Sequence, residues 1–308
     1  MDSFTVNRLT AFSSGKWCRQ SDLSIDPNDI GFIQGVTVAE RLRTFGGKTV
    51  FALKDHLDRL FQSLSIISLT IDYSFEELTL LCHELLSRNQ LHLGQNEDVG
   101  LTILVTPGPP ATQENPHPGT KLLLFLSPLP YHHIYHLYQN GQPLVISPQP
   151  QIPAECWPAA LKCRSRMHYY LADQFAQQKV PGAKALLLDQ QGNLCETSTA
   201  NIVLYSQDQG LFSPSKETIL PGISLAHLEK LAAKLNIPFT YKTLTTDDLY
   251  VADEIFLCST SPCIYPVVSI DQKEVSLGKP GKVFRTLLDA WSESVGTDLY
   301  NTTKSFAF

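Results

Sequence analysis

Apolar residues recur at helical spacing in two segments near the start of the chain. The segment 53–67 repeats leucine or phenylalanine every three or four positions, which places them on one helix face. The segment 74–88 has the same periodicity, and its Ser74 stands three residues before Glu77, the spacing of a capping box. We therefore predict two amphipathic helices.

Two strand-like runs follow these helices. They are GLTILVTPG at 100–108 and KLLLFLSPLP at 121–130, and the second ends in prolines that cannot donate a ladder hydrogen bond. Strands and helices together predict a small α+β domain over residues 1–126. The turn formers that come next break both periodicities, so we place an interdomain linker at 127–135.

The remaining chain, 136–308, is predicted to be a larger domain built mainly of short strands. Strand-like runs separated by glycine-containing turns occupy 184–214, and two more lie within 254–271. One helix is predicted after the Pro-Gly turn at 221–222, with the hydroxyl of Ser224 as its N-cap. A last helix is predicted over 280–294.

Composition excludes several functional classes. The 308 residues carry 24 Lys and Arg against 30 Asp and Glu, a net charge of -6 without a basic block, which argues against a nucleic-acid partner. No apolar run is long enough to cross a membrane and the start has no secretory pattern, so we expect a cytoplasmic protein. The seven cysteines include no C-x-x-C pair, which favours reduced thiols over disulfides or zinc.

Three neighbouring histidines could form a metal site. His132, His133 and His136 could offer two imidazoles to one ion if their segment were helical. The prolines at 128 and 130 favour a linker instead. We therefore predict no metal.

Three cations alternate in the stretch LKCRSRMHYYLADQ, at Lys162, Arg164 and Arg166. If the stretch is extended, they share one side, and the arginine charges would favour the neutral amine that an imine-forming lysine needs. A solvated basic strand edge, or pairing with Glu155 and Asp173, explains the same pattern.

Four other features have an ordinary explanation when taken alone. Arg59 could form an i,i+4 ion pair with Asp55 on a helix surface. Glu196 could be a polar position in a hairpin, and Thr260 a turn residue at a strand end. The helix start at Ser224 could be a capped terminus or an anion site.

In their order along the chain, these segments resemble the fold-type IV pyridoxal-phosphate enzymes. That family includes branched-chain and D-amino-acid aminotransferases and 4-amino-4-deoxychorismate lyase. The resemblance covers nearly the whole chain and is carried by residues 35–64, 160–176, 185–205, 219–232 and 249–267. Its most specific parts are an E-x-S-x-x-N hairpin, an I-L-x-G-I-[TS] turn and an A-D-E-x-F strand. It implies a small α+β N-terminal domain, a larger C-terminal domain with a β-barrel-like core that carries the cofactor lysine, and pyridoxal 5'-phosphate between them.

The resemblance also implies roles for single residues. Lys162 matches the lysine that holds the cofactor as an internal aldimine and moves the proton between Cα and the cofactor carbon C4′. Glu196 matches the carboxylate that keeps the pyridine nitrogen protonated. The other matches bind the phosphate or, for the leucine, pack on the ring: Arg59, Ile223, Ser224, Thr260 and Leu220.

The chain departs from the family pattern at its substrate-binding positions. Val38 stands where branched-chain enzymes usually have glutamate, and Met167 where they have tyrosine. Other branches carry T-R-G after the first long strand, but here the middle residue is Pro107, which cannot bind an anion. We expect another cation to hold the substrate carboxylate, and the candidates are Arg41, Arg43, Arg164 and Arg166.

The resemblance predicts an aminotransferase-like enzyme that moves an amino group between an amino acid and a 2-oxo acid. One alternative is 4-amino-4-deoxychorismate lyase, which releases pyruvate. Another is a non-catalytic relative that only binds the cofactor, although the retained Lys162 and Glu196 argue against it. The family also implies a homodimer.

Overall fold

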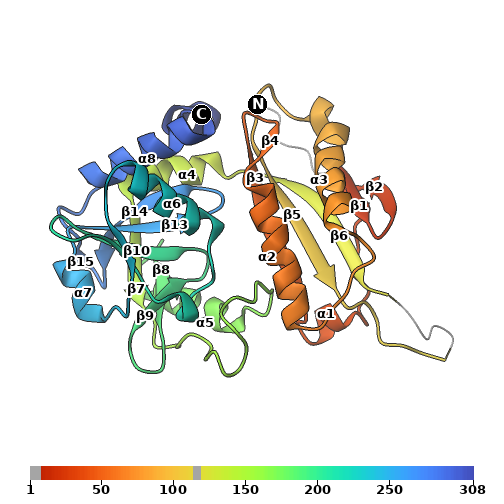
Figure 1. The fold of residues 1–308 in the computed structure, drawn as a ribbon, viewed down its shortest axis with the longest axis horizontal. Coiled ribbons are helices and arrows are strands. Elements are labelled where there is room, and N and C mark those ends of the chain that lie inside the picture. The colour runs from red at the N-terminus through yellow and green to blue at the C-terminus, as the bar shows by residue number, and fades with distance from the viewer. Residues whose placement is uncertain (1–7, 114–118) are drawn as a thin grey trace. The chain divides into compact units, whose positions relative to one another are not determined.

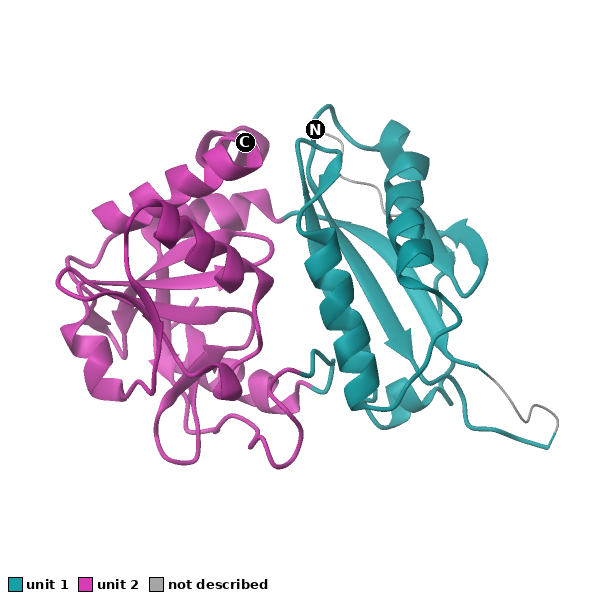
Figure 2. Ribbon diagram, in the orientation of Figure 1, with its two compact units in different colours: residues 1–129, 161–165 teal, residues 130–160, 166–308 magenta. Residues whose placement is uncertain are grey.

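The computed structural model describes residues 8–113 and 119–308, and it divides into two compact units (Figure 2). Unit 1 comprises residues 1–129 together with 161–165, and unit 2 comprises 130–160 and 166–308. The first seven residues of the chain, part of the segment in which we found no secretory pattern, lie outside the described residues.

Unit 1 is a six-stranded sheet in the order β2-β1-β6-β5-β3-β4, and every neighbouring pair in it is antiparallel. Its elements are β1 Thr10–Ser13, β2 Lys16–Arg19, η2 Gln20–Asp22, α1 Ile30–Ile33, β3 Val38–Phe45, β4 Thr49–Val50, α2 Leu53–Ile66, α3 Phe75–Asn89, η3 Gln90–His92, β5 Val99–Thr106 and β6 Lys121–Pro128. Helices α2 and α3 lie on one face of this sheet (Figure 1).

The core of unit 1 forms where the leucines of α2 and α3 meet alternate residues of β3, β5 and β6. Leu57 and Leu60 of α2 and Leu42 and Leu101 of the sheet are fully buried in one cluster. The predicted helices are confirmed. Ser74 also forms both halves of the predicted capping box with the residue three positions later.

Unit 2 contains a closed ring of six strands. Strands β10, β13, β14, β7, β8 and β9 follow one another, and β9 pairs back with β10. Its elements are α4 Tyr131–Asn140, β7 Gln142–Ile146, α5 Met167–Lys179, β8 Lys184–Leu188, β9 Leu194–Thr197, β10 Asn201–Ser206, β11 Gly210–Ser213, η4 Lys216–Thr218, α6 Ile223–Lys234, β12 Phe239–Tyr241, α7 Thr246–Val251, β13 Glu254–Ser259, β14 Cys263–Ile270, β15 Lys273–Glu274, α8 Lys282–Val295 and α9 Leu299–Ala307. The predicted barrel-like core is confirmed.

The segment 127–135, predicted as a linker, is regular structure. It contains the end of β6 and the first turns of α4, and the two units divide between Leu129 and Pro130. Helix α4 forms because Tyr131, Ile134 and Leu137 bury one face, and Pro130 precedes the helix, where a missing N–H does no harm.

The cation-rich stretch is extended only in its first part. Residues 161–165 belong to unit 1, whereas α5 begins at Met167. The lysine at 162 therefore lies in the compact unit formed mainly by residues 1–129, not in the one that contains most of 136–308.

Among the described residues, no helix is long and apolar enough to cross a membrane. The three histidines of the metal alternative lie on helix α4. Across 8–113 and 119–308, no group of three metal-binding side chains is gathered.

Candidate functional site

A buried ion pair joins α2 to β3 in unit 1. Arg59 donates from Nε and Nη2 to the two carboxylate oxygens of Glu40, both at 2.8 Å. His56 Nδ1 lies 2.7 Å from the same carboxylate. All three side chains are buried. Arg59 is therefore not the surface partner of Asp55 that helical spacing allowed.

The side chains in this cluster shift one another's pKa values. Burial alone would raise the pKa of Glu40, but the charge and hydrogen bonds of Arg59, with those of His56, lower it to about 2. Burial lowers the pKa of His56; the hydrogen bond and charge of Glu40 oppose this shift, and the charges of Arg59 and Lys162 add to it. Glu40 accepts from His56 Nδ1 and orients the Arg59 guanidinium.

Changing Glu40 to glutamine is expected to destabilise unit 1 and weaken any anion site at Arg59. Breaking a buried pair costs about 3–5 kcal/mol because one charge is left uncompensated. Because the folded pKa is below the ordinary 4.5, the Glu40 contribution to stability is complete above that pH and disappears as the pH falls toward 2. Urea unfolding at pH 7 and at pH 3.5 measures both effects.

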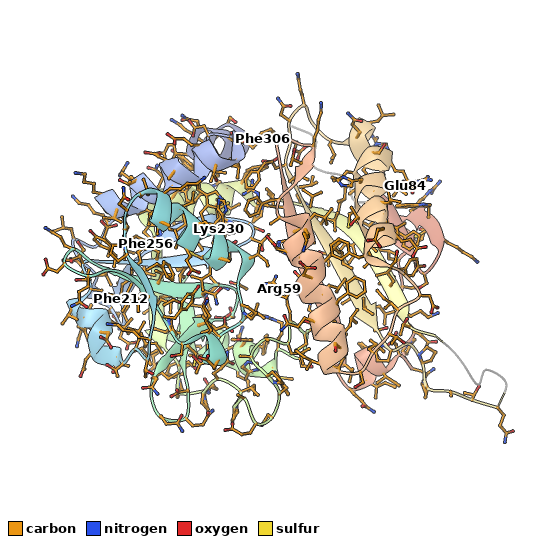
Figure 3. The ribbon with its side chains drawn as sticks, viewed as in Figure 1. Arg59, Glu84, Phe212, Lys230, Phe256 and Phe306 are labelled. Carbon is orange, nitrogen blue, oxygen red and sulfur yellow. The ribbon has the colours of Figure 1, made fainter. Side chains whose placement is uncertain are left out.

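The matched control is Glu84→Gln on α3. Glu84 pairs with Arg88 one helical turn away, and both side chains are 44% exposed, so its loss should cost less than about 1 kcal/mol. Arg59 and Glu84 are labelled in Figure 3. Equal unfolding free energies for the two variants would contradict a special role for Glu40.

The backbone around Lys162 adds a short extended segment beside β3. Cys163 forms an antiparallel bridge with Val38, and Ala39 N donates to Lys162 O at 3.1 Å. Lys162 N donates to Ser63 Oγ on α2 at 3.2 Å. The position of the candidate lysine is thus fixed by its backbone, through one contact to the strand and one to the helix.

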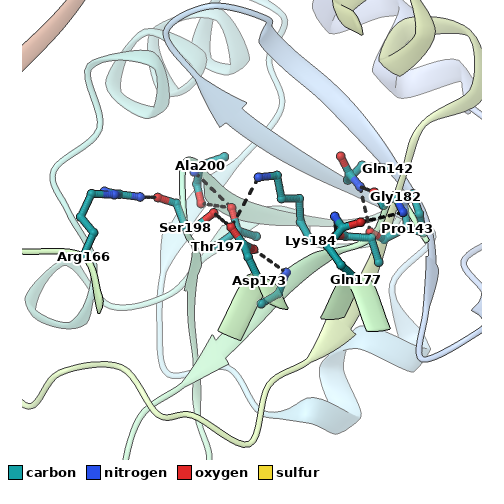
Figure 4. A network of polar contacts seen from close by, with 12 residues as sticks. Gln142, Pro143, Arg166, Asp173, Gln177, Gly182, Lys184, Thr197, Ser198 and Ala200 are labelled. Carbon is teal, nitrogen blue, oxygen red and sulfur yellow. Dashed lines mark hydrogen bonds and ion pairs between the residues drawn. The ribbon is translucent and has the colours of Figure 1, made fainter. Parts of the chain in front are cut away.

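Two of the four candidate arginines, Arg43 and Arg166, make contacts within the fold. Arg43 forms a buried ion pair with Asp98 at 3.1 Å, and its guanidinium stacks 4.2 Å from the ring centre of Phe45. Arg166 donates to the carbonyl of Ser198 (Figure 4). Its guanidinium also lies over the ring of Tyr169. Arg164 is exposed, and its backbone N–H donates to Thr37 Oγ1 at 3.0 Å.

Glu196 is the centre of a hydrogen-bond network in unit 2. Its Oε1 accepts from the Tyr169 hydroxyl at 2.8 Å and from Gln151 Nε2 at 3.2 Å. Its Oε2 accepts from Asn201 Nδ2 at 3.0 Å and from Leu220 N at 3.3 Å. Four hydrogen-bond donors thus converge on one buried carboxylate.

The Pro-Gly turn is attached to the same network. Asn201 Nδ2 also donates to Leu220 O at 3.0 Å, and a Cβ on Gly222 would overlap the Asn201 side chain. The turn therefore needs glycine where it meets the hairpin. Glu196 and Asn201 lie opposite each other in the β9–β10 pair, which explains the E-x-S-x-x-N spacing.

The predicted N-cap at Ser224 is wrong. Helix α6 begins at Ile223 with Gly222 as its N-cap, so Ser224 is the second helical residue. Within the described part of the chain, the hydroxyls of buried Ser224 and half-buried Thr260 make no hydrogen bond. The first N–H groups of α6 and these hydroxyls suit an anion.

Several residues of these networks were not predicted. Glu40 stands 19 residues before Arg59 in the chain and meets it only through the packing of α2 on β3. Gln151 and Tyr169 likewise reach Glu196 from other elements. Tyr169 follows Met167 by two residues on α5, while Met167, at the family's tyrosine position, is 70% exposed.

One family profile, described as amino-transferase class IV, matches residues 37–270. The D-alanine aminotransferase of Staphylococcus aureus (strain COL) is 27% identical over 287 residues, 92% of this chain and 97% of that protein. A Methanocaldococcus jannaschii protein named as a putative branched-chain-amino-acid aminotransferase is 27% identical over 286 residues, 92% and 96% of the two chains.

Solved structures share the fold. The branched-chain amino acid aminotransferase of Escherichia coli matches with a TM-score of 0.83 at 24% identity, covering 92% of this chain and 94% of that one. The branched-chain amino acid aminotransferase of the archaeon Thermoproteus uzoniensis, solved with norvaline, gives a TM-score of 0.81 at 22% identity, covering 94% and 96%. These likenesses confirm the predicted fold class.

Proposed function

The chain belongs to the class-IV aminotransferase family, and we propose that it transfers an amino group between an amino acid and a 2-oxo acid by means of pyridoxal 5'-phosphate attached to Lys162. Membership of this family confirms the prediction of an aminotransferase-like enzyme. The relatives described above carry aminotransferase names, so the lyase alternative is not favoured.

The observation that carries the cofactor proposal is the Glu196 network. When bound, the cofactor supplies an aldehyde that takes up the amino group and a ring that spreads the electron pair left at Cα. A buried carboxylate that is oriented by four hydrogen bonds is suited to keep a proton on the ring nitrogen. A residue that served only as a polar position in a hairpin would not need four donors.

The remaining candidate residues are suited to bind the cofactor phosphate and to carry the proton removed from Cα. Arg59 provides a guanidinium oriented by Glu40, and the start of α6 provides free N–H groups and the Ser224 hydroxyl. We assign the phosphate to these groups and to Thr260, and the ring face to Leu220. Lys162 Nζ holds the cofactor and carries the proton removed from Cα.

The experiment that tests this function has two parts. The purified protein is mixed with pyridoxal 5'-phosphate, reduced with borohydride and digested, and mass spectrometry should find the cofactor mass on the peptide that contains Lys162. The loaded protein is then given D-alanine or a branched-chain L-amino acid with a 2-oxo acid, and the new amino acid is measured. Label elsewhere, or pyruvate release from aminodeoxychorismate without amino transfer, would overturn the proposal.

We also propose an oligomeric state and a cellular location for the protein. We expect a homodimer, because Met167, Tyr170 and Leu171 expose one apolar face of α5 at spacings of three and four residues. Sedimentation equilibrium should give twice the chain mass of 34.3 kDa. A cytoplasmic location stays a prediction from composition.

A further inference from the structure

Arg41 on β3 is a cation that pairs with no carboxylate among the described residues. Its Nη1 donates to the hydroxyls of Thr102, at 3.2 Å, and of Ser127. Within residues 8–113 and 119–308 no acidic side chain pairs with it, whereas Arg43 and Arg59 each have a buried carboxylate. A partly buried charge compensated only by hydroxyls is stabilised when an anion binds to it.

The electrostatic environment supports the same interpretation. Burial lowers the pKa of Arg41 to about 10, and the positive charge of Arg164 acts in the same direction. The group still carries its proton at neutral pH. Two guanidinium groups close enough to influence each other form a local positive potential, and a bound anion would relieve their repulsion.

Gly100 makes room for the guanidinium of Arg41. A Cβ at this position of β5 would overlap Nη1, Nη2 and Cζ of Arg41, so the guanidinium lies directly over the glycine backbone. In the register, Gly100 pairs with Ser127 on β6, which is the second hydroxyl partner. The absence of a side chain at 100 therefore fixes where the charge lies.

The backbone pattern places Arg41 on the same face as Lys162. Val38 points into the core and bridges Cys163, so Ala39 and Arg41 point to the opposite face, and Lys162 and Arg164 alternate in the same way. Lys162 lies opposite Ala39, which makes Arg41 its diagonal neighbour. Such neighbours have Cβ atoms about 7–8 Å apart, and from there the Arg41 guanidinium extends over Gly100 of β5 toward Ser127 of β6.

We propose that Arg41, with Arg164 beside it, binds the carboxylate of the amino acid and oxo acid substrates in place of the arginine missing at Pro107. This assignment rests on the proposed function, because it needs the substrate amine to react at Lys162. Nη2 and Nε of Arg41 donate to no described residue, so two N–H groups can meet the two oxygens of a carboxylate. The substrates are then carboxylic acids rather than simple amines.

The test uses two variants that disturb the charge differently. Arg41→Met removes the charge, and Gly100→Ala keeps it but displaces the guanidinium. Both should raise the KM of the amino acid donor, by about 10–150-fold for Arg41→Met, the loss of a charged hydrogen bond of about 1.5–3 kcal/mol. The KM of the donor's carboxamide, which lacks the negative charge, should not change. Arg285→Met, an exposed arginine on α8, is the control and should keep the wild-type KM.

The dissociation constant of pyridoxal 5'-phosphate is measured on the same variants. If wild-type protein takes up no cofactor at Lys162, the proposed function fails before Arg41 is tested. If cofactor binding is normal but Arg41→Met and Gly100→Ala keep the wild-type KM, the assignment of Arg41 is wrong. An equal rise in KM for the acid and its carboxamide would also overturn it, because the effect would not depend on the carboxylate charge.

Discussion

Replacing Lys162 by alanine is expected to lower kcat on the order of 10⁴-fold, the upper end of what a positioned acid-base group contributes. The effect should be this large because we assign the same amine to the cofactor bond and to proton transfer at Cα. The backbone contacts of Lys162 with Ala39 and Ser63 do not involve its side chain, so the fold should be retained. Single-turnover rates of the cofactor-loaded protein measure the effect.

A small primary amine distinguishes this role from a structural one. Ethylamine added to Lys162→Ala should restore part of the rate, since it can carry the proton that the side chain carried. Lys230→Ala, an exposed lysine of α6, is the control and should keep wild-type activity without amine. A Lys162→Ala variant with wild-type kcat would refute the assignment.

Glu196→Gln should lower kcat by about 10²–10³-fold, the range observed when one preorganised electrostatic partner is removed. The glutamine keeps the size of the side chain but loses the negative charge that favours a proton on the ring nitrogen. Its NH₂ group would also face a donor that Glu196 now accepts from. Steady-state kinetics at pH 7 should show the loss mainly in kcat.

The pH dependence of the rate distinguishes two explanations for a slow Glu196→Gln variant, the loss of the negative charge and misfolding. Without the carboxylate, the pKa of the ring nitrogen falls, so the rate of Glu196→Gln should recover as the pH is lowered, while wild type shows no such recovery. Glu229→Gln, whose carboxylate accepts from Tyr241 on β12, is the matched control. A pH profile parallel to that of wild type would argue against charge as the function of Glu196.

The sequence was sufficient to predict an element where one local pattern determines its structure. Helices α2 and α3 follow from leucine spacing, and the capping box at Ser74 forms as expected. Helix α4 was missed because prolines at 128 and 130 suggested a break, although the burial of Tyr131 and Ile134 supplies a helical face. A proline ahead of a helix marks its start as easily as an interruption.

The candidate site was predictable only where a motif is continuous. Glu196 and Asn201 belong to the E-x-S-x-x-N hairpin, and they pair directly across it. Glu40 gave no signal, since its partner Arg59 approaches only when α2 packs on β3. Arg41 and Arg43 were equivalent in sequence, and the structure separates them because Asp98 pairs with Arg43 while hydroxyls bind Arg41.

The short segment 161–165 limits how this protein can be divided or recombined. Its residues interrupt unit 2 along the chain but belong to unit 1, where they lie beside β3. A gene cut between residues 129 and 130 would separate Lys162 from Ala39 and Ser63, its backbone partners. Exchange of the later part between relatives would thus separate the proposed cofactor lysine from the strand that contacts its backbone, so we expect such chimaeras to need both parts from one protein.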